Sequence, residues 1–263
     1  MLFTPAFLFL FPAIDPAFPR LTPNQAIAMG LIVEFVGYTS SSSAYCYRRM
    51  VAFDVARQLL LVTVPVAVAF SFISFTVPPR WLLVAFGGIL FLLAGIMVWQ
   101  RRARAAPGGE AAASPDDTGE AMRRHVSREG HVFAYRFRAG GLDRAVSAVA
   151  GAFGGLTGIG AGPIVTTILH ARHHLPLHLT TATSIFVVAV TVLSAAASHA
   201  LLSLQRNVAL PWALVGTMAV AVLLGGQIAA RVARWVPERF MRRALIGMFL
   251  FVGVLMLVRA LGM

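Results

Sequence analysis

Hydrophobic residues fall in long blocks along the chain, and short polar or arginine-bearing turns separate these blocks. A helix needs about 20 mostly apolar residues to span a bilayer, because the hydrocarbon core is ~30 Å thick. Six stretches approach or reach that length: Ala26–Tyr45, Gln58–Phe75, Trp81–Trp99, Leu179–Leu202, Val208–Ala230 and Phe240–Leu261. The pattern therefore predicts an all-α integral membrane protein with about six full transmembrane helices.

A seventh apolar stretch, Arg144–Leu169, has a different pattern. Its middle, Gly154–Pro163, holds five glycines and a proline, and residues of these two types interrupt a helix. Two arrangements follow from the break. The stretch either crosses the membrane once, or enters and leaves on the same side as two half-helices joined at the glycines.

The arginine distribution favours the second arrangement. A single crossing would separate the arginines between Arg231 and Arg243 from those of the central linker and of the loop Arg48–Arg57. A re-entrant segment puts all three groups on one side, which agrees with the excess of positive charge on the cytoplasmic side of membrane proteins. It also inverts one set of helices relative to the other, a common plan of transporters.

The chain divides into two membrane repeats joined by a polar segment. Residues 1–100 form the first repeat and residues 143–263 the second, and Leu21–Ala28 matches Leu175–Ala182 in register. The similarity between the repeats is weak. Residues 101–142 are rich in Pro, Gly, Ser and Arg, which predicts a solvated, partly disordered and cytoplasmic linker.

The composition excludes a soluble protein of ordinary type. The chain is 58% hydrophobic and 12% charged, whereas about a quarter of the residues of soluble proteins are charged. A lipid bilayer is therefore the expected environment. The net charge of +12 comes from arginines that lie between the apolar blocks, so we expect no nucleic-acid partner.

The glycine break is the first candidate for a binding site. Glycines let a ligand approach the backbone closely, and the N-terminus of a half-helix presents unpaired N–H groups that suit an anion. Gly158, Gly160, Gly162 and Pro163 are the candidate residues, with Pro163 early in the second half-helix. The alternative is that these glycines only allow close helix packing, and spacing does not decide between the two.

Polar residues inside the predicted spans are the next candidates. Glu34 is the one acid within a span, and a charge at mid-membrane costs about 2.5–3.5 kcal/mol on insertion scales. It is a candidate for proton coupling or gating, or a structural acid. Ser40, in the run that follows, could line a wet path or bond back to the helix. Thr180 and Thr181 begin a later span, where their hydroxyls are candidates for binding the substrate and either could cap the helix.

No enzyme active site or resident cofactor is expected. The sequence lacks a nucleophile motif, a zinc-protease motif and a phosphate loop. His170, His173, His174 and His178 have spacings that can bind a metal, but Pro176 interrupts the helix and no acid or cysteine joins them. We interpret this group as a charged interfacial loop with no metal, and His199 as a structural histidine.

The second half resembles the TauE/SafE sulfite exporter family. The residues that carry the resemblance are Gly154–Val165, Leu175–Pro176, Ala182–Ser184 and Gly225–Arg231. The resemblance implies a multi-pass permease of the cell membrane for sulfite, sulfonates or related small anions, without a bound cofactor. It also makes Ser184 a substrate-binding candidate beside the glycines.

Two features depart from the family pattern. Ala161 replaces a glycine of the motif, and the sequence begins at Met1 where the family has its first glycine-rich stretch. We therefore expect the first repeat to be truncated in its N-terminal arm. An alternative function is a non-transporting membrane subunit, or a partner in a hetero-oligomeric complex. A homo-oligomer is equally compatible with the sequence.

Overall fold

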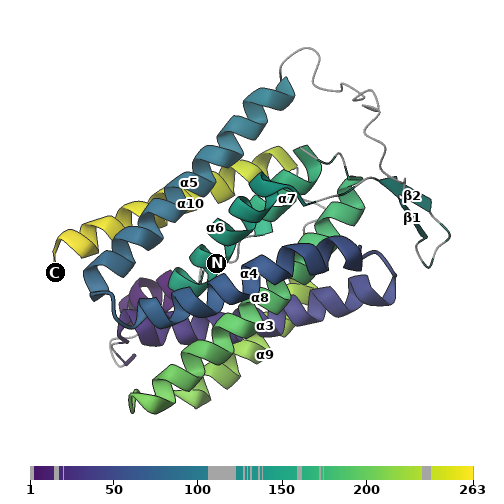
Figure 1. The fold of residues 1–263 in the computed structure, drawn as a ribbon. Helices are drawn as coiled ribbons and strands as arrows, with labels where there is room; N and C mark the ends of the chain where they lie inside the picture. Colours follow the sequence, from purple (N-terminus) through teal and green to yellow (C-terminus); the bar gives the residue numbers. More distant parts are fainter. Residues whose placement is uncertain are drawn as a thin grey trace.

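The structure is a computed structural model of the chain. It describes residues 3–14, 18–19, 21–105, 123–126, 128, 130, 132–135, 137, 139–158, 162–171, 173, 175–232 and 238–262. Most of these residues lie in helices, and the strands among them form one two-stranded hairpin. The fold is therefore all-helical around its core, as the apolar pattern predicts (Figure 1).

The elements follow the apolar blocks of the sequence. A short N-terminal helix consists of α1 (Phe3–Pro5), the π-helical η1 (Ala6–Leu10) and α2 (Phe11–Ile14). The long helices of the first half are α3 (Pro23–Tyr47), α4 (Phe53–Ser74) and α5 (Pro79–Ala105). After the strands β1 (Arg123–Val126) and β2 (Val132–Tyr135) come α6 (Gly141–Thr157), α7 (Gly162–Ala171), α8 (Leu177–Gln205), α9 (Trp212–Val232) and α10 (Glu238–Leu261).

Within the described residues, four helices are long and apolar enough to cross a membrane. These stretches are Phe53–Ser74, Pro79–Val98, His178–Gln205 and Arg243–Leu261. The apolar part of α9 is shorter, at Trp212–Gly225. The fold is thus that of an all-α multi-pass membrane protein, and the count of six spans remains a prediction.

Helix α3 does not meet the same measure of apolarity, although it is 25 residues long. It carries Glu34 and a run of serines, and its first half is buried within the bundle. A helix that is covered by protein does not need an apolar face toward lipid. Its start is fixed by a capping box, in which Thr22 and Gln25 satisfy each other's backbone N–H groups.

Helices α3 and α8 occupy the centre of the bundle and pack against each other. Helix α8 also packs on α4, and α3 on α9, so each central helix contacts the second long helix of the other half. The last helices of the two halves, α5 and α10, lie side by side (Figure 1). The largest buried cluster joins α3, α5 and α10 through residues such as Met29, Phe86 and Met256.

The two halves also use matching polar contacts. The Gln25 side-chain amide at the start of α3 donates to the Ala209 carbonyl oxygen before α9, at 2.9 Å. In return, the Ala52 N–H before α4 donates to the Thr183 hydroxyl near the start of α8, at 3.1 Å. The turns that end α3 and α8 each contain a residue with positive φ, Arg49 at 52° and Asn207 at 51°.

The hairpin was not predicted from the sequence. Helix α5 continues to Ala105, past the expected start of the linker, and residues 106–122 lie outside the described residues. Strands β1 and β2 pair antiparallel from Arg123 opposite Tyr135. The hairpin lies at one end of the bundle (Figure 1) and contacts the α3–α4 turn, where His125 Nε2 donates to the Arg49 carbonyl oxygen at 2.8 Å.

Candidate functional site: a helix pair that folds back at a glycine turn

Helices α6 and α7 form a pair that folds back on itself. Helix α6 ends at Gly158, whose φ of 72° is left-handed and whose N–H donates to the Gly154 carbonyl oxygen at 3.0 Å. At the opposite end, Asp143 in the first turn of α6 lies 2.9 Å from His173 Nε2, just after α7. The beginning and the end of the broken segment are therefore in direct contact.

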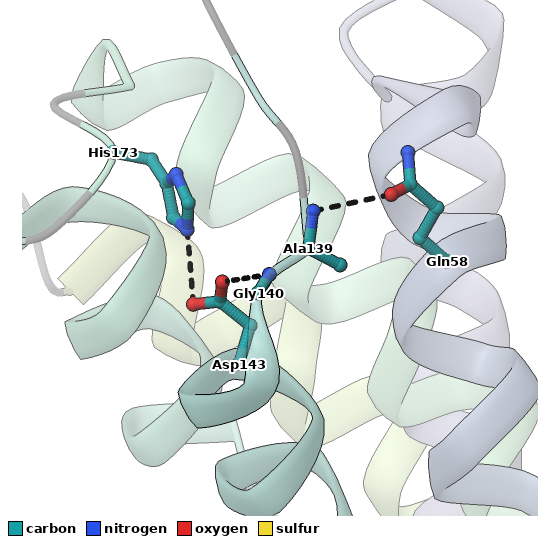
Figure 2. Close-up of polar contacts among 5 residues, drawn as sticks. All are labelled: Gln58, Ala139, Gly140, Asp143 and His173. Carbon is teal, nitrogen blue, oxygen red and sulfur yellow. Dashed lines mark hydrogen bonds and ion pairs between the residues drawn. The ribbon is translucent and has the colours of Figure 1, made fainter.

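The base of this pair is a polar cluster, which Figure 2 shows. One Asp143 oxygen accepts the Gly140 N–H at 2.7 Å and the other meets His173. Nearby, the Ala139 N–H donates to Gln58 Oε1 on α4 at 3.2 Å. Asp143 is 1% exposed, so these contacts compensate the cost of burying its carboxylate. Sequence reasoning missed this pair because the two residues are 30 positions apart, on either side of the glycine break.

Close packing explains two glycines of α6. A Cβ atom on Gly151 would overlap the Thr63 carbonyl oxygen of α4, and one on Gly155 would overlap the Ala67 carbonyl oxygen. Both helix backbones therefore approach as closely as small residues allow in a membrane protein. At Gly151 and Gly155, glycine thus allows close helix packing, which the sequence analysis gave as the alternative to ligand binding.

The glycine turn itself lies between the two central helices. A Cβ on Gly158 would contact Leu31 and Ile27 of α3, and one on Gly162 would contact Val188 of α8. The structure therefore brings Gly158 and Gly162 together near the α3–α8 crossing. Pro163 is the second residue of α7, as its missing N–H requires. Gly160 lies outside the described residues.

A pair of hydroxyl groups joins α7, one turn after its first residue, to α8. The oxygens of Thr166 and Ser184 are 2.8 Å apart. Thr166 Oγ1 lies 2.8 Å from the Gly162 carbonyl oxygen, and Ser184 donates to the Thr181 carbonyl oxygen at 3.0 Å. Ser184, 2% exposed, therefore lies beside the second half-helix, and its role in binding remains a prediction. Thr166 was missed, although it follows Gly162 by one helical turn.

The threonines at the start of α8 have structural contacts. The Thr180 hydroxyl donates to the Leu175 carbonyl oxygen at 3.2 Å and is fully buried. Thr181 contributes the backbone oxygen that Ser184 uses. Their predicted role in binding remains a prediction, while the contacts show that they hold the α7–α8 connection in place.

A small cavity adjoins this region between α4, α6, α7 and α8. It is lined by Thr63, Gly154 and Thr191 together with four valines, and its water-accessible space is about 10 Å³. A volume of that size holds about one water molecule. The bundle is closed here, and a larger anion would need the surrounding helices to separate.

Glu34 and Ser40 occupy different surroundings. Glu34 is 5% exposed and follows, by one turn of α3, the Leu31 side chain that meets Gly158. Ser40 is exposed, near the end of the same helix, and its carbonyl oxygen accepts the Ser43 hydroxyl at 2.9 Å. Helical rise places the two about 9 Å apart along the axis. Glu34 is thus near the turn, and Ser40 is not.

The histidine group does not assemble into a metal site in the described part of the chain. His173 contacts Asp143 and the Phe137 ring, whose centroid is 4.5 Å away. The side chain of His178 is exposed. The side chains of His170 and His174 lie outside the described residues.

The comparison with protein families gives one match. The model of the family described as sulfite exporter TauE/SafE matches residues 1–256. The match covers both halves of the molecule, including the N-terminal helix and the fold-back pair. Neither a curated protein nor a solved structure matches the chain.

Proposed function

The chain belongs to the TauE/SafE sulfite exporter family, and from this premise we propose that it carries small sulfur-containing anions such as sulfite across the cell membrane. The family and the apolar helices support a multi-pass membrane transporter. The fold-back pair α6–α7 is the observation that carries the more specific proposal. It places a non-helical turn in the middle of the bundle, between α3 and α8.

The chemistry of this turn supports an anion as the ligand. Non-helical backbone at membrane depth is tolerated where it faces protein or a wet cavity. The first N–H groups of α7 lack helical partners, and the helix dipole gives that end a partial positive charge. Binding by the first backbone N–H groups of α7, from Gly162 on and beside Gly158 and Pro163, suits an oxyanion without requiring a buried arginine.

The hydroxyl pair completes the proposed site. Ser184 and Thr166 lie 2.8 Å apart at the first turn of α7, and both can rotate to donate to an oxyanion. Thr180 and Thr181 lie near the start of α8, the helix that carries Ser184. In the closed bundle the hydroxyls bond to one another and to the backbone. We propose that the anion replaces these internal contacts when the adjoining cavity widens.

The proposed architecture is a pair of inverted repeats with a re-entrant segment. The exchanged contacts of Gln25 with Ala209 and of Ala52 with Thr183 support it, as does the contact between the two ends of the α6–α7 pair. The arginine-rich loops then share the cytoplasmic side. In such transporters, substrate binds at the interface of the repeats near the midplane, and we propose that the turn between α6 and α7 lies at that depth.

Glu34 is the proposed coupling residue of this site. Its burial one turn from the Leu31–Gly158 contact would let its protonation state affect the turn. In a Glu34→Gln variant we expect sulfite flux to lose its dependence on a proton gradient. Flux that still follows the gradient would remove Glu34 from this role.

A non-transporting membrane subunit is the second candidate function. One observation favours it: the described residues contain a single glycine-broken helix pair, and the N-terminal helix Phe3–Ile14 has no such turn. A subunit of this kind would bind a partner through the same fold but move no anion by itself.

Flux in purified proteoliposomes tests the proposed function and separates the two candidates. We expect radiolabelled sulfite to equilibrate across vesicles that contain the protein, with saturation at high concentration. Unlabelled sulfite should compete strongly, and chloride weakly. A sulfite rate equal to that of protein-free vesicles would instead favour the subunit.

A further inference from the structure

A second buried polar group lies at the far end of α6, away from the hydroxyl pair. His199 of α8 is fully buried, and Ser203, one turn further along the same face, is 1% exposed. The Nδ1 atom of His199 and the hydroxyl of Ser203 both have no hydrogen-bond partner among the described residues. Two neighbouring polar groups that stay buried without partners require an explanation, because each costs desolvation free energy.

The contacts of the imidazole fix its tautomer. His199 Nε2 lies 2.9 Å from the Gly155 carbonyl oxygen, which can only accept a hydrogen bond. Nε2 therefore carries the proton in the neutral ring, and Nδ1 carries a lone pair. This second nitrogen is the atom that can take up a proton, and once protonated it is a donor with a positive charge.

The residues around the ring lead from the glycine turn toward the surface. The imidazole meets the last turn of α6, because Gly155 lies three residues before Gly158, whereas Ser184 precedes His199 by 15 residues on α8, about 22 Å along the helix axis. Ser74 Oγ is 3.5 Å from Nε2, and the Phe75 ring centroid is 5.3 Å from the imidazole. Past Ser203, exposed Arg206 donates to the Phe75 carbonyl oxygen at 2.9 Å and lies over its ring.

We propose that His199 and Ser203 form a second anion station, which binds a sulfite-like oxyanion when His199 takes up a proton at Nδ1. The proposal rests on the proposed function and adds a step to its path. In the neutral state the Nδ1 lone pair repels an anion. In the charged state the Nδ1–H group and the Ser203 hydroxyl offer two donors on one face of α8, and charge-assisted hydrogen bonds are the stronger kind.

The arrangement gives the path a direction. An anion that leaves the turn at Gly158 meets His199, then Ser203 and then Arg206, at helical spacings of four and three residues. The guanidinium at the exposed end attracts an anion without burying its own charge. Proton and anion would then bind together at the station and leave together.

The described groups that face His199 from the neighbouring helices carry no negative charge. A bound anion would therefore determine whether the ring is protonated. From α4 these are Ser74 and Phe75, and from α6 the Gly155 carbonyl oxygen. On α8 itself the charged group is Arg206. From α3, the phenol of Tyr38 packs against the cluster that contains Ala195 and Ala196, the turn before His199. Within these described contacts no carboxylate meets the ring, so an anionic ligand is its natural counter-charge.

The test compares the pH dependence of sulfite flux in wild type and His199→Gln proteoliposomes. A glutamine amide can still donate to the Gly155 carbonyl oxygen, but it cannot take up a proton. We expect the ratio of the wild-type rate to the His199→Gln rate to rise on the acidic side to about ten, a factor typical of one lost hydrogen bond to a charged group. The titration of sulfite itself is common to both proteins and cancels.

Ser203→Ala provides an independent arm, since it leaves the imidazole and its contact with Gly155 untouched. It should raise the KM for sulfite severalfold, and Ser198→Ala, whose hydroxyl bonds only to its own helix at Ser194, should not. A pH profile of His199→Gln that has the wild-type shape would overturn the proposal. So would an unchanged KM in Ser203→Ala. Absence of flux in the wild type itself would instead reject the proposed function.

Discussion

The two ends of α6 each contact a histidine, and the two histidines are held in different ways. At the first end, His173 Nε2 meets the Asp143 carboxylate at 2.9 Å (Figure 2). The Phe137 ring packs against the imidazole. At the other end, His199 Nε2 meets the Gly155 carbonyl oxygen at the same distance. The first histidine has an acid beside it and the second does not.

This difference separates an anchor from a binding group. The Asp143 carboxylate gives the His173 ring a hydrogen-bond partner at 2.9 Å, so the base of the fold-back pair is a stable contact. A carbonyl oxygen orients the ring but supplies no full counter-charge. His199 can therefore respond to an anion, whereas His173 already has one. The same helix thus has a fixed end and a responsive end.

The largest effect should come from the close contact at the responsive end. Gly155→Ala would drive a Cβ into the Ala67 carbonyl oxygen of α4, and a backbone atom cannot move aside cheaply. We expect a loss of about 3 kcal/mol in stability, measured as a lower Tm by tryptophan fluorescence in detergent.

Its neighbour provides the matched control. A Cβ on Gly154 would lie 3.6 Å from Thr191 Cγ2, an ordinary contact, so Gly154→Ala should leave the Tm unchanged or raise it slightly. Equal Tm values for the two variants would show that α6 and α4 are less closely packed than described.

A smaller effect should follow at the anchored end. Asp143→Ala removes the acceptor for the Gly140 N–H and for His173, which costs about 2 kcal/mol if both stay buried. Asp143→Asn keeps an acceptor for the Gly140 N–H and should lose about half as much. The Tm series in detergent orders the three proteins. If the asparagine and alanine variants were equally destabilised, the charge of Asp143 would contribute more to stability than its hydrogen bond with the Gly140 N–H.

The sequence predicts the local features of this molecule well and its long-range contacts poorly. Gly158 and Pro163 mark the break because glycine and proline act on their own backbone. The contact between Thr166 and Ser184 depends on the fold-back, which brings two helices together. Tyr135 and Phe137 are buried by packing against α4, α7 and α8, so their part of the linker carried no local signal of order.

The same reasoning explains why His199 was interpreted as a structural residue. A single histidine in an apolar helix has no neighbour in sequence that indicates a partner. The unpartnered Nδ1 becomes visible only when Gly155 of α6 is placed against Nε2. The hydroxyls of Thr63 and Ser71, by contrast, bond to their own helix and would look alike in any fold.

The location of the anion at the first turn of α7 is the central claim, and the KM of Ser184→Ala for sulfite in proteoliposomes tests it most directly. Ser194→Ala is the control, because that hydroxyl lies on the same helix and bonds to the Thr191 carbonyl oxygen. The account predicts a KM raised about three- to tenfold in Ser184→Ala, the effect of one lost hydrogen bond, and an unchanged KM in Ser194→Ala. Equal KM values in both variants and the wild type would contradict it.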